Sequence, residues 1–171
     1  MKKLLIVVDM QEDFISGSLG TKEAEAIVPN VVAKIAGFEG DVVYTRDTHT
    51  PQYLDTAEGK KLPVLHCIKD TAGWQIHPEV WDAGVGKTVA VIDKPTFGSV
   101  ELGDFAEDGH YESIELIGLC TDICVISNAL CLKARLWETP IAVCKNCCAG
   151  VTPASHDNAL SAMGMCQIDI L

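Results

Sequence analysis

The sequence has no long hydrophobic run and few basic residues. No stretch of its 171 residues approaches the roughly 18 consecutive apolar residues that a membrane-spanning helix needs, so we expect no membrane anchor. Lysine and arginine number 13 against 24 aspartates and glutamates, which gives a formal net charge of −11. Nucleic acids and anionic membranes repel such a chain, and the composition therefore argues against both as partners.

The first residues also lack the features of an export signal. The apolar run at residues 4–8 stops at Asp9, and no small-residue cleavage site follows it. Without export, the eight cysteines are expected to be reduced rather than paired in disulfides. The sequence thus predicts a cytoplasmic protein, and its length and balanced composition predict a single globular domain over residues 1–171.

Short apolar runs alternate with helical patterns along the chain. Continuous apolar or β-branched runs predict strands at residues 4–8, 41–45, 88–92, 114–117, 141–143 and 166–170. Apolar residues at helical spacing predict helices at residues 21–36, 123–136 and 154–163. This alternation is typical of a three-layer αβα fold with a central, mostly parallel sheet of about six strands. Residues 47–81 show no period, and an irregular segment of that length is usually functional.

Polar side chains stand where four of the predicted strands end. Asp9 follows the first strand, Asp47 the second, Lys94 the third, and the turn at residues 120–124 the fourth. Ligands of such folds bind beyond the carboxyl ends of the parallel strands, which meet at one edge of the sheet. We therefore expect two carboxylates, an ammonium and a thiol to converge there.

Cys124 is the candidate nucleophile at this edge. It falls in the predicted first turn of a helix, where unpaired backbone N–H groups and the helix dipole favour a thiolate. Asp9 could carry a proton from the thiol to a leaving amine, and Lys94 could balance the charges of both. Backbone N–H groups around Cys120 could stabilise an oxyanion. Each residue alone also fits a structural role in a core or turn, and it is their convergence that favours catalysis.

Three motifs resemble the isochorismatase-like cysteine hydrolases, and within them the nicotinamidase/pyrazinamidase type. They are residues 7–14 (VVDMQEDF), residues 94–99 (KPTFGS) and residues 118–125 (GLCTDICV). They follow the order of the family and span nearly the whole chain. The resemblance implies an isochorismatase-like, Rossmann-like fold.

The resemblance also assigns roles to individual residues. It implies a catalytic triad of Asp9, Lys94 and Cys124. It implies a cis peptide bond between Leu119 and Cys120, with the backbone N–H groups of Cys120 and Cys124 as the oxyanion hole. Cys120 would then act through its backbone and not through its thiol.

A metal site is indicated in the segment without a period. Asp47 and His49 stand two residues apart and His66 follows 17 residues later, and these ligand types suit Zn²⁺, Mn²⁺ or Fe²⁺. Spacing this loose is a weak motif, because a carboxylate and an imidazole also cap and pack polar loops. By the resemblance, Asp47, His49 and His66 are metal ligands. Glu58 stands where a further ligand would lie, with Asp55 as the competing candidate.

The resemblance places Phe14 and Leu119 in the substrate pocket. Nicotinamidases usually offer a second aromatic residue shortly before the last metal-site histidine, whereas this chain has residues 62–65 (LPVL) there. Trp74 or Trp81 could supply the missing ring, since a pyridine ring gains from stacking. A tryptophan in a loop equally fits plain packing.

Cys144, Cys147 and Cys148 form a cluster that includes a CxxC spacing. A zinc site normally needs four ligands, and no second pair of this kind occurs in the sequence. The cluster begins on a predicted apolar strand, where cysteine behaves as a small hydrophobic residue. A structural role is therefore favoured.

Together these features predict a cysteine-dependent amidohydrolase acting on the C–N bond of a small carboxamide. The preferred reaction is nicotinamide to nicotinate plus ammonia through a thioester acyl-enzyme. One alternative is a hydrolase of another small amide, imide or carbamoyl compound. Another is a metal-binding or ligand-binding member of the fold without turnover. The resemblance further implies a homo-oligomer, either a dimer or a tetramer.

Overall fold

The structure, a computed structural model, describes residues 2–171. Within this range six strands form a sheet in the order β3-β2-β1-β4-β5-β6, and every neighbouring pair is parallel. The strands are β1 (Lys3–Val8), β2 (Asp41–Asp47), β3 (Thr88–Lys94), β4 (Ser113–Leu119), β5 (Ile141–Ala149) and β6 (Asp169–Ile170). The predicted parallel sheet of six strands is confirmed.

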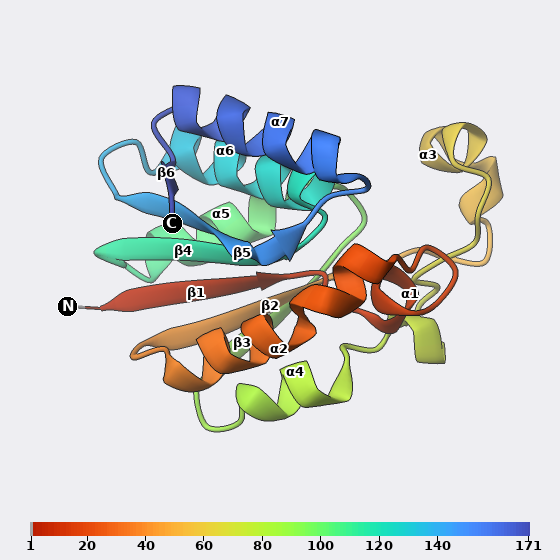
Figure 1. Cartoon of the computed structure of the whole chain (residues 1–171), viewed down its shortest axis with the longest axis horizontal. Coiled ribbons are helices and arrows are strands. Elements are labelled where there is room, and N and C mark those ends of the chain that lie inside the picture. The colour runs from red at the N-terminus through yellow and green to blue at the C-terminus, as the bar shows by residue number, and fades with distance from the viewer. Residues whose placement is uncertain (1) are drawn as a thin grey trace.

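Helices cover both faces of the sheet (Figure 1). One layer contains α2 (Lys22–Gly37) and α4 (Pro78–Ala83), and the other contains α5 (Val100–Asp108), α6 (Ile126–Arg135) and α7 (Pro153–Met165). The short helices α1 (Glu12–Ile15) and α3 (Ala57–Lys61) lie beyond the carboxyl end of β1, and α3 stands apart from the layers. The three-layer αβα arrangement is therefore as predicted.

The core is divided by the sheet into two hydrophobic clusters. Side chains of β1 alternate between them, since Leu4, Ile6 and Val8 pack toward α5, α6 and α7. Leu5 and Val7 pack toward α2 and α4. All five are fully buried, and each such side chain contributes about 1.5–3 kcal/mol of hydrophobic stabilisation. A strand buried on both faces needs this continuous apolar run.

Several predicted strand boundaries were wrong. Strand β4 ends at Leu119 rather than at residue 117, and β5 ends at Ala149 rather than at residue 143. Strands β2 and β3 run two residues further than predicted, so that Asp47 and Lys94 are the last residues of their strands. The last strand covers only Asp169–Ile170, because α7 continues to Met165 and a turn with Gln167 at φ 63° follows. A sequence pattern locates a strand by its apolar residues and misses polar residues that continue its ladder.

Residues 47–81 are not irregular throughout. They contain the 3₁₀ turns η1 (Tyr53–Asp55) and η2 (Ala72–Trp74), the helix α3 and the start of α4. Thr56 caps α3 by accepting a hydrogen bond from the Gly59 N–H at 3.0 Å, and Pro78 begins α4. Elements of three to six residues are too short to show a hydrophobic period.

The end of β4 is shaped by Gly118. Its φ is +117°, and a Cβ built there would lie 2.1 Å from the Val8 carbonyl oxygen on β1. Only glycine fits both conditions. The Leu119–Cys120 peptide bond that follows is cis, as the resemblance implied. Among residues 2–171, no helix combines the length and the apolar character needed to cross a bilayer.

Candidate active site

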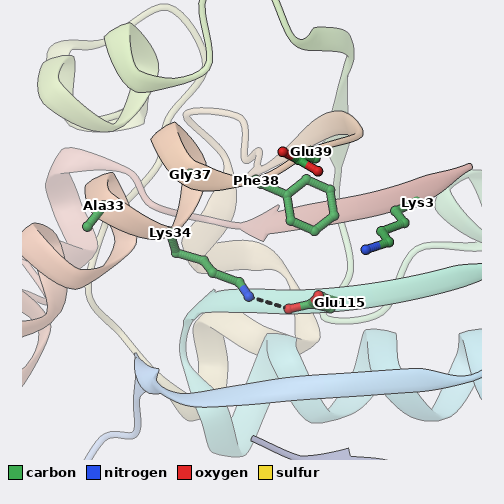
Figure 2. Close-up of a pocket in the computed structure, with 7 residues that line it drawn as sticks. All are labelled: Lys3, Ala33, Lys34, Gly37, Phe38, Glu39 and Glu115. Carbon is green, nitrogen blue, oxygen red and sulfur yellow. Dashed lines mark ion pairs between the residues drawn. The ribbon is translucent and has the colours of Figure 1, made fainter. Parts of the chain in front are cut away.

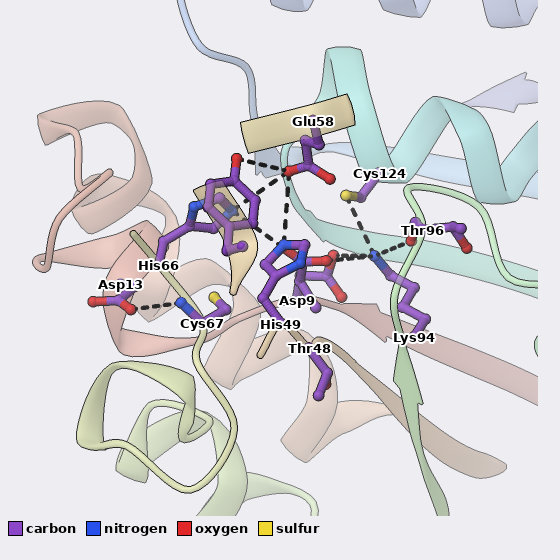
Figure 3. A network of polar contacts seen from close by, with 12 residues as sticks. Asp9, Asp13, Thr48, His49, Glu58, His66, Cys67, Lys94, Thr96 and Cys124 are labelled. Carbon is purple, nitrogen blue, oxygen red and sulfur yellow. Dashed lines mark hydrogen bonds and ion pairs between the residues drawn. The ribbon is translucent and has the colours of Figure 1, made fainter. Parts of the chain in front are cut away.

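Asp9, Lys94 and Cys124 meet at the carboxyl edge of the sheet (Figure 3). Asp9 directly follows β1 and has φ 47°. Its Oδ2 lies 2.6 Å from Lys94 Nζ, and Lys94 Nζ donates a hydrogen bond to Cys124 Sγ at 3.4 Å. The ammonium of Lys94 thus contacts both the Asp9 carboxylate and the Cys124 thiol, which come from separate parts of the chain.

The three groups are removed from solvent. The exposed fractions are 0% for Asp9, 1% for Lys94 and 4% for Cys124. Burial raises the pKa of Asp9, although Lys94 acts against this. Burial alone would lower the pKa of Lys94, but Asp9, Cys124 and Asp47 outweigh it and hold that pKa above its ordinary value. The ammonium therefore stays charged, and the Asp9 carboxylate is a stronger proton acceptor than an ordinary aspartate.

The predicted bias of Cys124 toward thiolate was wrong. Burial, followed by the neighbouring Asp9, raises the pKa of Cys124 well above that of an ordinary thiol, and the opposing charge of Lys94 is weaker. The residue also lies in a π-helical turn, η3 (Thr121–Val125), and α6 begins only at Ile126. Cys124 therefore holds its proton at rest, in a position to pass it to Asp9.

Two polar residues that the sequence analysis did not single out hold this arrangement. The Thr45 hydroxyl on β2 donates to Asp9 Oδ1 at 2.6 Å. Asn128 on α6 donates from Nδ2 to the carbonyls of Cys124 (2.8 Å) and Phe97 (3.1 Å). Its Oδ1 accepts the Ser99 N–H at 2.9 Å. Asn128 thus joins the Cys124 turn to the loop after Lys94. Its position four residues after Cys124, one helical turn away, was the sequence signal that could have identified it.

Four further side chains form a second polar group beside the triad. Each side chain offers one ligand atom, and these four atoms all lie within 4.8 Å of one another. The residues are Asp47, His49, Glu58 and His66. Asp47 Oδ2 is 2.9 Å from His49 Nε2 and 3.4 Å from His66 Nε2. Glu58 Oε1 is 3.6 Å and 3.7 Å from the same two nitrogens. The structure thus brings together all four predicted metal ligands, and the group includes Glu58 rather than Asp55.

This donor set fits a divalent metal ion. Two imidazoles and two carboxylates are ligands of Zn²⁺, Mn²⁺ and Fe²⁺. His66 Nδ1 is 2.8 Å from the Val64 carbonyl, so Nδ1 is a donor, and in the neutral imidazole Nε2 faces the group with its lone pair. Asp47 offers Oδ2 to the group, since that oxygen lies near both imidazole nitrogens and Oδ1 faces Lys94.

The side chains of the four-residue group shift one another's pKa values. Burial would raise the pKa of Asp47, but hydrogen bonds to His49 and His66 and the charge of Lys94 hold it below the ordinary value. Burial would lower the pKa of His66, but Asp47 and the Val64 carbonyl raise it above the ordinary value. Asp47 is therefore ionised at neutral pH, as a metal ligand must be.

Aromatic rings surround the four-residue group. Tyr53 is fully buried, with its ring centroid 4.6 Å from that of His49 and 4.9 Å from that of His66. Its hydroxyl donates to the Leu62 carbonyl at 2.9 Å and lies 3.3 Å from Glu58 Oε1. The Phe14 ring lies 5.5 Å from that of His66. Tyr53 was missed because it falls in the segment without a period.

The two tryptophans considered for the pocket pack against β2. The Arg46 guanidinium lies 3.6 Å from the Trp74 ring centroid, and the Trp74 indole N–H donates to Thr48 Oγ1 at 2.9 Å. The Trp81 ring packs 5.5 Å from the ring of Tyr44. These contacts favour the packing alternative. Leu119, the other predicted pocket residue, is buried at the end of β4.

Comparison with known proteins agrees with this geometry. Residues 3–170 match the model of the isochorismatase domain. The chain belongs to this family. It is similar to the nicotinamidase of Saccharomyces cerevisiae, with 26% identity over 81% of this chain and 85% of the relative. A pyrazinamidase from Pyrococcus horikoshii, solved in complex with zinc, superposes with a TM-score of 0.83 at 25% identity, covering 100% of this chain and 99% of that one. The N-carbamoylsarcosine amidase of Thermoplasma acidophilum superposes with a TM-score of 0.77 at 26% identity, covering 99% and 95%.

Residues after Asp9 in the motif of residues 7–14 also hold the segment that carries the four-residue group. Gln11 accepts the Asp47 N–H at 2.7 Å and donates to the Asp47 carbonyl at 2.9 Å. Asp13 Oδ2 accepts the Cys67 N–H at 2.8 Å, next to His66. The residues after Asp9 therefore position the backbone of two predicted ligands.

Proposed function

We propose that this isochorismatase-family chain is a cysteine-dependent amidohydrolase that converts nicotinamide to nicotinate and ammonia. The observation that carries the proposal is the buried contact of Cys124 and Asp9 with Lys94, at 3.4 Å and 2.6 Å. A nucleophile, a proton acceptor and a fixed positive charge in contact are what amide hydrolysis through a thioester requires. The nicotinamidase of S. cerevisiae supports the choice of substrate.

The reaction begins with attack of Cys124 Sγ on the carboxamide carbon. Asp9 accepts the thiol proton as the C–S bond forms, which explains why a thiol with a raised pKa can serve as nucleophile. The oxyanion is stabilised by the backbone N–H groups of Cys120 and Cys124. Lys94 remains charged and offsets the negative charge that gathers on sulfur and carboxylate.

The intermediate then collapses. The C–N bond breaks, Asp9 returns the proton to the departing nitrogen, and ammonia leaves a thioester on Cys124. A water molecule gives a proton to Asp9 and attacks the thioester carbon. The C–S bond breaks, sulfur regains a proton from Asp9, and nicotinate is released.

We further propose that Asp47, His49, Glu58 and His66 hold a divalent cation, with Zn²⁺, Mn²⁺ and Fe²⁺ as the candidates. When bound, the ion would offer a Lewis-acid position for the ring nitrogen of the substrate or for an ordered water. Phe14 and Leu119 would form walls of the substrate pocket. Assembly as a homo-oligomer and a cytoplasmic location stay predictions, and light scattering of the purified chain tests the first.

A second candidate function is hydrolysis of a carbamoyl compound. The chain has residues 62–65 (LPVL) where nicotinamidases usually offer a second aromatic residue, and the N-carbamoylsarcosine amidase of T. acidophilum has the same fold. The triad chemistry is unchanged, because ammonia again leaves a carbonyl carbon. The two candidates therefore differ in the pocket and not in the nucleophile.

Ammonia release from a panel of small amides tests both candidates. We expect the wild type to release ammonia from nicotinamide with equimolar nicotinate, and the Cys124→Ala variant to release none. Release from N-carbamoyl amino acids but not from nicotinamide would favour the second candidate. Equal release by the Cys124→Ala variant would contradict the cysteine mechanism in either case.

A further inference from the structure

Cys144 and Cys147 are brought together by an irregularity in β5. Between Leu116↔Val143 and Gly118↔Cys148, β4 advances by two residues while β5 advances by five. Residues 144–147 therefore form a bulge with three extra residues. In a regular strand, side chains three residues apart point to opposite faces and lie about 10 Å apart. Here the two sulfurs are 3.5 Å apart and share a hydrogen bond.

The bulge is held against α2. Asn30 Nδ2 on this helix donates to the Asn146 carbonyl at 2.9 Å, and Cys147 Sγ lies 3.6 Å from the Asn30 carbonyl. Cys147 is buried, whereas Cys144 is half-buried. A reagent in solution thus reaches the Cys144 thiol first, and the Cys147 thiol lies deeper in the structure.

A positive charge lies close to both sulfurs. Lys34 on α2 forms an ion pair with Glu115 at 2.5 Å, as Figure 2 shows. Burial would lower the pKa of Lys34, but Glu115 and the charges that Cys144 and Cys147 can carry raise it above its ordinary value. Burial raises the pKa of Cys147 to about 12, the charge of Lys34 acts against this rise, and the charge of Glu115 adds to it.

We propose that Cys144 and Cys147 form a reversible dithiol–disulfide pair, a modification site for low-molecular-weight disulfides that is separate from Cys124. The Cys144 thiolate attacks one sulfur of oxidised glutathione, whose S–S bond breaks to release one glutathione thiolate. Cys147 then loses its proton and attacks the Cys144 sulfur, which breaks the mixed disulfide and releases a second glutathione. Two protein thiols are oxidised by two electrons and one glutathione disulfide is reduced to two thiols.

The site lies close to the Cys120 turn along the sheet. Cys148 and Ala149 directly follow the bulge and pair with Gly118 and Leu119 on β4. A covalent bond between Cys144 and Cys147 therefore fixes the backbone conformation directly before Cys148 and Ala149. These residues pair with the end of β4, and β4 leads to Cys120. This placement joins a redox-sensitive bulge to the same edge of the sheet as the triad.

Peptide mapping of the full-length chain tests the proposal. The purified protein is incubated with oxidised glutathione, free thiols are blocked with N-ethylmaleimide, and the protein is digested with trypsin without reduction. Trypsin cleaves after Lys145, between the two cysteines, so only a disulfide joins residues 136–145 to residues 146–171. We expect this joined peptide to exceed glutathionylated Cys144 by at least about tenfold, because a neighbouring thiol acts at high effective concentration. Dithiothreitol should separate the two halves.

Variants identify the partner sulfur. Cys148→Ser should keep the joined peptide, whereas Cys147→Ser should lose it and carry glutathione on Cys144. Fragmentation of the wild-type joined peptide by tandem mass spectrometry assigns the bond independently of how a variant folds. The exposed Cys131 and Cys166 should carry glutathione and serve as internal controls. Wild-type protein with glutathione on Cys144 and no joined peptide would overturn the proposal, as would a joined peptide that persists in Cys147→Ser.

Discussion

Asp47 lies opposite Lys94 in the register of β2 and β3, and its Oδ1 is 4.0 Å from Lys94 Nζ. One carboxylate therefore belongs to the four-residue group through Oδ2 and faces the triad through Oδ1. Its negative charge contributes to raising the pKa of both Asp9 and Lys94. A cation held by Asp47 would weaken this influence, so the two polar groups are coupled electrostatically.

Metal affinity should depend on Glu58 and not on Asp55. Glu58 supplies one of the four converging ligand atoms, whereas Asp55 is exposed and outside the group. We expect Glu58→Gln to weaken Zn²⁺ binding at least about tenfold, because a neutral amide oxygen is a poorer ligand. Competition with a chromophoric chelator measures the affinity, and Asp55→Asn is the matched control. Equal losses in the two variants would contradict the assignment.

The pH dependence of turnover should reveal the raised pKa of Asp9. Asp9 must be ionised to accept the thiol proton, and burial raises its pKa from the ordinary value of 3.8. Activity should therefore fall on acidification at a higher pH than an ordinary aspartate would give. The profile of kcat/KM for nicotinamide against pH measures this fall.

The Thr45→Val variant gives a second test of the raised pKa of Asp9. The Thr45 hydroxyl donates to Asp9 Oδ1 at 2.6 Å and thereby favours the carboxylate, so its removal should raise the pKa of Asp9 further. The acidic fall in kcat/KM should then move to higher pH. Thr71→Val, at an exposed position, should leave the profile in place. A shift of the Thr45→Val profile to lower pH would show that Asp9 is not the group being titrated.

The elements that the sequence predicted well are those with a local physical cause. The continuous apolar run of β1 and the helical spacing of α2 follow from burial, and the strand-end rule placed Asp9, Asp47 and Lys94 at one edge. Glu58 came from the resemblance, because nothing local distinguishes it from Asp55. Tyr53 and Asn128 were missed, since their partners are remote in sequence or are backbone groups that carry no side-chain signal. The predicted protonation state of Cys124 was wrong because burial depends on the tertiary structure and outweighs the effect of the helix end.

Asn128 should stabilise the active-site turn. Its amide makes three hydrogen bonds, of which those to Ser99 and Cys124 are buried and that to Phe97 is partly buried. Asn128→Leu keeps a similar volume but leaves these backbone groups unpaired, which we expect to cost about 1–3 kcal/mol in the free energy of unfolding. Urea denaturation measures the loss. The same substitution at the exposed Asn158 should change stability by less than about 0.5 kcal/mol, and equal effects at the two positions would contradict the role of the buried bonds.

Gly118 should not tolerate any side chain. Its φ of +117° is strained for every other residue, and a Cβ would lie 2.1 Å from the Val8 carbonyl oxygen. Gly118→Ala must therefore displace backbone on β1 directly before Asp9, and we expect a loss of at least about 2 kcal/mol in the free energy of unfolding. Gly37→Ala is the matched control, because a Cβ at Gly37 meets nothing within 4 Å and alanine stabilises helical positions. Urea denaturation of both variants measures the difference. A Gly118→Ala protein as stable as Gly37→Ala would mean that β1 and β4 can separate at this point without cost, and that the close approach of Gly118 to Val8 does not hold the Cys120 turn beside Asp9.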